Sequence, residues 1–189
     1  QASTALNFDS YGFGVANQDR WGVPAPRSGK VPTQAQIESA LMNGITPVQV
    51  SKSKTSIVKG ITTFASNGGS PDYRVRPRHI VTVCDHYADD LVSVIHSRFP
   101  NKTLGDDRDD GDPGPVDQVS PKMVKAVIDK LTTDYGKDGL LGEVDAIKAA
   151  TVVARDPNNS ERVNARVPLV VINLLGQVGL RLEQTSTLQ

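Results

Sequence analysis

An acidic segment is the place in this sequence where residue types and spacing could do chemistry. Residues 104–117 read LGDDRDDGDPGPVD, and five of the seven residues from Asp106 to Asp112 are aspartates. Oxygen-rich loops of this kind bind calcium, because a large hard cation takes about six to eight oxygen ligands. The segment therefore raises the hypothesis of a calcium site.

The spacing of these aspartates does not match the EF-hand calcium loop. If Asp106 takes the first position, Arg108 falls on the third position, where the motif requires a side-chain oxygen. Asp117 falls on the twelfth position, where the motif uses the longer glutamate. Because a run of like charges is usually a solvated loop, we expect no metal ligand here. A calcium-dependent binding module that uses Asp106–Asp112 stays open as the alternative function.

Other catalytic and metal-binding patterns are weak. His79 and His86 share a helix face with Asp90, but two helical turns separate the histidines by about 10 Å along the axis, too far for one ion. The sequence has no Gly-x-Ser-x-Gly elbow and no phosphate loop with lysine and serine. A carboxylate pair of the glycosidase kind stays open, although the chain is only 5% aromatic and sugar sites are rich in aromatic residues. We expect no enzyme activity, no catalytic residue and no cofactor.

The composition excludes several classes of partner. The chain of 189 residues carries 21 basic and 21 acidic side chains, so no net field attracts nucleic acid or an anionic membrane. Apolar residues make up 38% of the chain, and no apolar run reaches the roughly 18 residues that span a bilayer. The single cysteine, Cys84, rules out an internal disulfide and favours a reducing compartment. We expect no direct nucleic-acid binding and no membrane insertion.

The first part of the chain predicts a short helix followed by a β-hairpin. Thr33 and Gln36 have the spacing of a capping box, and Asn43-Gly44 is a helix stop. The runs TPVQV and SIVKGITTF favour strands, and the polar SKSKT between them predicts a hairpin. Residues 1–32 are rich in glycine and proline, which favours turns and short extended pieces. Because the chain enters this stretch directly from Gln1, we expect it to be a fragment of a longer protein.

Two long amphipathic helices are predicted, one on each side of the acidic segment. The first covers residues 76–99, where apolar side chains recur at helical spacing: Ile80, Cys84, Tyr87, Leu91, and Val94 or Ile95. The second starts at the cap Ser120, has Pro121 in its first turn and ends at Gly136. Its apolar stripe consists of Val124, Val127, Ile128, Leu131 and Tyr135. We expect both stripes to face one sheet built from the β-like residues that follow Ala150.

The fold class predicted from these elements is α+β: a mixed β-sheet flanked by two long amphipathic helices, with a β-rich N-terminal extension. The last β-like stretch, VGLRLEQT, alternates apolar and polar side chains. A strand at a chain end either closes the sheet of its own chain or pairs with the sheet of another chain, and both options stay open. The residues expected at such a subunit interface are Val178, Gly179, Leu180, Arg181, Leu182 and Glu183.

The order of these segments resembles the contractile-tail sheath proteins of Mu-like bacteriophages and prophages. The resemblance begins in NGITPVQV…IVKGITTF (residues 43–64) and continues in RPRHIVTVCDHYADDLVSVIHSRFPNKTLGDD (76–107). It persists in VSPKMVKAVIDKL (119–131) and in GLLGEVDAIKAATVVARDPNNSERVNARVPLVVINLLGQVGLRLEQT (139–185), with its arginine-containing turn around Arg162. It therefore extends over residues 31–189.

The resemblance implies the C-terminal portion of a sheath subunit, a non-enzymatic structural protein of the virion tail that is assembled in the host bacterial cytoplasm. Residues 1–32 would trail from a preceding sheath domain, and residues 33–189 would form the tube-facing C-terminal domain with its terminal β-strand arm. Sheath subunits stack as rings around the inner tail tube, and their contraction drives the tube through the bacterial envelope. The implied partners are other sheath copies, the tube protein, the baseplate and the tail terminator.

The acidic segment gains a second interpretation from this resemblance. Its aspartates are candidates for a contact with a basic patch on the tube or on a neighbouring subunit, through charges that salt screens. The residues concerned are Asp106, Asp107, Asp109, Asp110 and Asp112.

Overall fold

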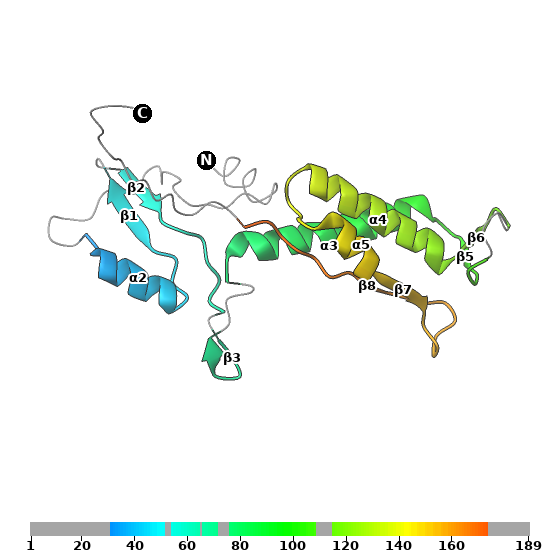
Figure 1. The fold of residues 1–189 in the computed structure, drawn as a ribbon, viewed down its shortest axis with the longest axis horizontal. Coiled ribbons are helices and arrows are strands. Elements are labelled where there is room, and N and C mark those ends of the chain that lie inside the picture. Colours follow the sequence, from blue (N-terminus) through cyan, green and yellow to red (C-terminus); the bar gives the residue numbers. More distant parts are fainter. Residues whose placement is uncertain (1–30, 52–53, 65, 72–75, 109–114, 174–189) are drawn as a thin grey trace, which may run out of the picture.

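The computed structural model of this chain describes residues 31–51, 54–64, 66–71, 76–108 and 115–173. The described part is elongated, with a small helix and hairpin at one end and the long helices at the other (Figure 1). Its helices are α2 (Gln34–Met42), α3 (Arg78–Arg98), α4 (Pro121–Lys137) and α5 (Val144–Ala150). Its strands are β1 (Val48–Ser51), β2 (Lys54–Ile57), β3 (Ser66–Asn67), β4 (Ser70–Pro71), β5 (Thr103–Leu104), β6 (Gln118–Val119), β7 (Val152–Arg155) and β8 (Val163–Arg166).

The short helix and the hairpin predicted near the start of the chain are confirmed. The capping box is complete, because the Thr33 hydroxyl accepts from the Gln36 backbone N–H and the Gln36 side chain accepts from the Thr33 N–H. Strands β1 and β2 pair antiparallel, with Val48 opposite Ile57. The second strand ends earlier than the apolar run SIVKGITTF predicted, and Ile61 forms only an isolated bridge with Pro77.

The two long helices are also confirmed, at nearly their predicted bounds. Helix α4 starts where predicted, with the Ser120 hydroxyl accepting from the Met123 backbone N–H. It continues one residue past Gly136, and the left-handed glycine after it is Gly139, whose φ is 73°. The helices meet through Tyr87 and Tyr135, whose rings pack edge to face with centroids 5.1 Å apart.

The buried face of α3 differs in part from the predicted stripe. Its buried residues are His79, Val83 and Tyr87. Of the predicted stripe, only Tyr87 is among them, and Leu91 packs against the core while half-buried. The difference arises because α3 carries apolar residues on adjacent rows, and the spacing alone does not decide which row faces α4.

The strands of the described residues do not join into the single mixed sheet that the sequence predicted. They form four separate two-stranded sheets, of which only β5–β6 is parallel. The α+β class therefore holds, but its expected central sheet does not appear in this part of the chain. The strands of these pairs are two to four residues long, and no pair is hydrogen-bonded to another pair in the described residues. The predicted terminal strand, residues 178–183, lies outside the described residues.

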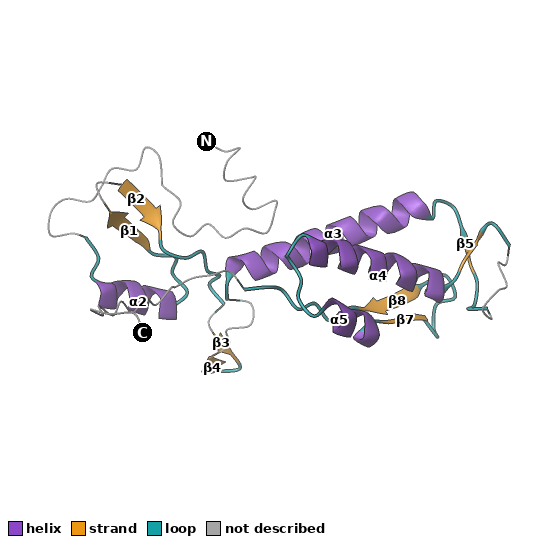
Figure 2. Cartoon of the chain, turned by 45° about the horizontal axis from the view of Figure 1, so that its top comes forward, coloured by secondary structure: helices purple, strands orange, loops and turns teal. Residues whose placement is uncertain are grey.

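The core lies between α3, α4, α5 and the extended chain that follows β8. One cluster of buried residues is Val83, Tyr87, Tyr135, Leu141 and Ile147, and a second is Val119, Val124 and Ile128. Leu91 from α3 and Val167 from the extended chain pack against both clusters. Figure 2 shows α3 and α4 running together, with β7, β8 and α5 beside them. Among the described helices, none has the length and apolar character that crossing a membrane requires.

Candidate functional site

The start of the acidic segment is attached to the protein by its own side chains. Asp106 accepts a hydrogen bond at 2.8 Å from the guanidinium of Arg155, which belongs to β7. Asp107 accepts a hydrogen bond at 2.7 Å from the backbone N–H of Lys122, in the first turn of α4. A carboxylate at this place satisfies one of the free N–H groups of the helix and lies at the positive end of its dipole. Both side chains therefore stabilise contacts within the chain, one with β7 and one with α4.

The C-terminal end of the acidic segment is also held by contacts within the chain. The ammonium of Lys102 lies 2.8 Å from the Asp117 carboxylate and also donates to the backbone carbonyl of Val116. The Lys102 contact holds the pKa of Asp117 below its ordinary value. Arg108, which occupied the third EF-hand position, donates to the side chain of Gln118 instead.

The structure gives no geometry for a metal site at these aspartates. Asp109, Asp110 and Asp112 lie outside the described residues, so their contact role stays a prediction. Within the described ranges, no cluster of three histidine, cysteine, aspartate or glutamate side chains could hold a metal ion.

His79 is a buried titratable group at the start of α3. Its imidazole donates a hydrogen bond to the backbone carbonyl of Ile172, and its Nε2 atom has no partner among the described residues. Burial lowers the pKa of His79 below the ordinary 6.5, and the nearby charge of Lys59 lowers it further, although the hydrogen bond to Ile172 acts the other way. The side chain is therefore a neutral core residue that joins α3 to the extended chain near Ile172.

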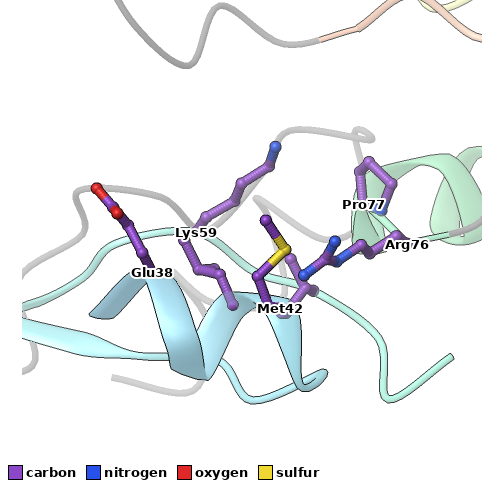
Figure 3. A pocket seen from close by; sticks show the side chains of 7 residues that line it. Glu38, Met42, Lys59, Arg76 and Pro77 are labelled. Carbon is purple, nitrogen blue, oxygen red and sulfur yellow. The ribbon is translucent and has the colours of Figure 1, made fainter. Parts of the chain in front are cut away.

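A mostly apolar pocket of about 350 Å³ lies between α2 and the residues that lead into α3. Figure 3 shows Met42 and Pro77 on its walls, with Glu38, Lys59 and Arg76 around them. Leu41 and Ile61 complete the apolar lining. Its charged residues are Glu38, Lys59 and Arg76, and the other four lining residues are apolar. A mostly apolar lining of this kind suits an apolar side chain.

The outward side of the β7–β8 pair is a second apolar surface, which we name the strand face. In the extended chain, Val167, Leu169 and Val171 point into the core, so the alternating residues point outward. Val152, Val170 and Ile172 are 60%, 41% and 45% exposed. We define the strand face as the exposed residues Val152, Ala154, Asn164, Arg166, Pro168, Val170 and Ile172.

The fold has a solved counterpart. The chain is similar to the crystal structure of the sheath tail protein from Desulfitobacterium hafniense, with a TM-score of 0.56 and 14% sequence identity. The fold resembles that of a tail sheath protein. The match covers 86% of this chain and 37% of that chain, so the chain spans little more than a third of the solved protein's length. No protein-family model and no curated protein matches the sequence.

The predicted resemblance to tail sheath proteins is therefore confirmed as a structural likeness, whereas the roles of the predicted interface residues are not tested. The sequence reasoning missed the strand face. The unbroken apolar run Leu169–Ile172 could have indicated this surface. An extended segment that is apolar on both sides is typically covered on both sides, so such a run predicts a second contact. In the described residues only one of its sides is covered.

Proposed function

We propose that this chain is part of a structural subunit of a contractile phage tail sheath. In this proposal the subunits polymerise into stacked rings around the inner tail tube, and their contraction drives the tube through the bacterial envelope. The observation that carries the proposal is the structural likeness to a sheath tail protein over 86% of the chain. The role is mechanical and not enzymatic, and the subunit acts in the virion tail after assembly in the host bacterial cytoplasm.

The finer parts of the proposal rest on the order of the sequence segments. Residues 33–189 form the tube-facing C-terminal domain of a sheath from a Mu-like phage or prophage, and residues 1–32 trail from the preceding domain. The partners are other copies of the subunit, the tube protein, the baseplate and the tail terminator. The terminal strand, residues 178–183, pairs with the sheet of a neighbouring subunit, because backbone pairing can link bodies that rotate relative to each other during contraction.

The contacts of the acidic segment refine its proposed role. Because Asp106 binds Arg155 and Asp107 binds the start of α4, the proposed contact with a partner is assigned to Asp109, Asp110 and Asp112, which lie outside the described residues. We propose that these three face a basic patch on the tube or on a neighbouring subunit. The internal contacts of Asp106 and Asp107 each occupy one carboxylate oxygen, and no observation favours the calcium alternative.

Electron microscopy of the complete subunit tests the proposed function. The complete reading frame that contains this chain is expressed and imaged by negative stain, and we expect rings or tubes with a central channel. A complete subunit that stays monomeric at high concentration would contradict the proposal. A second variant that lacks residues 178–189 should lose assembly while its thermal unfolding stays cooperative.

A further inference from the structure

We propose that the strand face packs against the outer face of helix α3 in a second copy of this chain. This inference rests on the proposed function, because it names one contact by which subunits of a polymer could meet. The α3 outer face is defined by Asp85, Ala88, Asp89 and Val92. In this proposal the strand face of one copy contacts the α3 outer face of the next copy, so the contact joins two different surfaces.

The strand face has the composition of a protein contact. Val152 of β7 and, in the chain that follows β8, Val170 and Ile172 beside Gly142 are exposed apolar side chains. Arg166 lies directly opposite Val152 in the strand pair, is exposed and forms no ion pair with a described residue. An apolar patch with one available cation fits a partner that is apolar and acidic.

The outer face of α3 has the complementary composition. Val92 is 54% exposed, and Ala88, Asp85 and Asp89 are exposed beside it. These four residues recur at three- and four-residue spacing, so they share one side of the helix, away from Val83 and Tyr87 in the core. Asp85 and Asp89 are one turn apart and neither has an ion-pair partner in the described residues. Such a pair of like charges repels itself, and a cation from a partner would relieve the repulsion.

The two surfaces cannot meet within one molecule. Leu91 of α3 and Val167 of the extended chain contact the same two core clusters from different elements. The strand face and the α3 outer face are therefore the sides of these elements that point away from the shared core. A contact between them needs two copies, and because the two surfaces differ, each copy keeps one surface free for the next. Such a heterologous contact produces open chains or rings, the kind of growth that a helical sheath needs.

The contact is small, and its test must take this into account. Stable pairs of proteins bury about 800 Å² on each partner, which a few valines, one isoleucine and an ion pair do not reach. We therefore expect the contact inside the assembled polymer and not as a dimer in dilute solution.

Cysteine cross-linking in the assembled subunit tests the contact. Cys84 is first replaced by serine, and Val170→Cys and Val92→Cys are then introduced into the complete subunit. After assembly, a short bismaleimide should convert the subunit that carries both cysteines into a ladder of dimers, trimers and longer chains. A mixture of the two singly substituted subunits should give dimers only. As a control, Val116→Cys with Val92→Cys, in which Val116 is highly exposed but lies on the β5–β6 side of the molecule, should give no ladder.

The outcomes separate this inference from the proposed function. Tubes that form without a ladder would overturn the contact while leaving the sheath function in place, whereas absence of tubes would count against the function itself. Dimers from Val170→Cys alone would show that two strand faces meet, and cross-links from Val170→Cys to the tube protein would show that the tube occupies the face. Either result contradicts the proposal. A charge exchange is the second test: Arg166→Asp should slow assembly at low salt several-fold, and adding Asp85→Arg and Asp89→Arg should restore it.

Discussion

The carboxylate of Asp107 accepts a hydrogen bond from the backbone N–H of Lys122, with 2.7 Å between the two atoms. Lys122 is the second residue of α4, and the Ser120 hydroxyl takes the next N–H, that of Met123. The start of α4 is thus capped from two directions, one local and one from the acidic segment.

Removing the Asp107 carboxylate should destabilise the chain. We expect Asp107→Ala to lower the free energy of unfolding by about 1 kcal/mol, the usual value of a helix cap with a favourable charge. Asp107→Asn should cost less, because the amide oxygen still accepts the hydrogen bond. Urea denaturation followed by circular dichroism measures both. Glu161→Gln, a charge removal at an exposed turn residue, is the control and should leave stability unchanged.

The hydroxyls of Tyr87 and Thr132 form a buried pair between α3 and α4, with their oxygens 2.8 Å apart. Thr132 already donates its single hydrogen to the carbonyl of Ile128, so Tyr87 must be the donor in the pair. Thr132→Val keeps the shape but leaves the Tyr87 hydroxyl without its partner in the core. We expect a loss of about 1–3 kcal/mol in the free energy of unfolding.

A double-mutant cycle isolates this hydrogen bond. Tyr87→Phe alone should cost about 1 kcal/mol, and Tyr87→Phe combined with Thr132→Val should cost less than the sum of the two single changes. The reason is that the double variant leaves no unpaired tyrosine hydroxyl. Strict additivity of the two changes in urea denaturation would mean that the hydroxyls do not interact.

Gly136 in the last turn of α4 is packed against Val144 of α5. A Cβ at this position would overlap the Cγ2 atom of Val144. Gly136→Ala in a helix interior normally gains about 1 kcal/mol, but here we expect a net loss of about 1–2 kcal/mol because the core is overpacked. Adding Val144→Ala should recover stability relative to Gly136→Ala alone. Thermal unfolding of the two variants and of Val144→Ala measures this coupling, and equal effects of Gly136→Ala with and without Val144→Ala would contradict it.

The elements with local signals could be predicted from the sequence. The capping box of Thr33 and Gln36 and the pair Ser120-Pro121 fix where α2 and α4 begin, because a cap involves only residues three positions apart. The hairpin of β1 and β2 is local for the same reason. The order of these local segments was enough to suggest the sheath resemblance, which the structural likeness then confirmed.

The long-range contacts could not be predicted. Asp106 meets Arg155, which is 49 residues away, and the Tyr135 hydroxyl donates to Asp90 across 45 residues at 2.6 Å. The sequence shows that the acidic segment carries many aspartates, but its local spacing does not indicate which of them forms an ion pair with a distant arginine or lysine. The absence of a central sheet from the described residues has the same cause: alternation shows that a segment favours a strand but does not identify its partner strand.

His79 should make the stability of the chain depend on pH. Burial lowers the pKa of this histidine in the folded chain, whereas in the unfolded chain it titrates near its ordinary 6.5. Between these two values the unfolded state binds more protons, so the free energy of unfolding rises with pH across this window and falls as the pH drops below about 6.5. Above that value the imidazole is neutral in both states and adds no pH dependence.

Substitution of His79 tests this assignment. His79→Gln keeps a donor for the Ile172 carbonyl and removes the titration, so its free energy of unfolding should vary less between about pH 5 and pH 7 than that of the parent chain. The comparison is made by urea denaturation at several pH values. His96→Gln, at an exposed position on the same helix, should keep the pH dependence of the parent. If His79→Gln and the parent chain lose stability equally on acidification, another group carries the effect, because a neutral imidazole held at the start of α3 cannot then be its source.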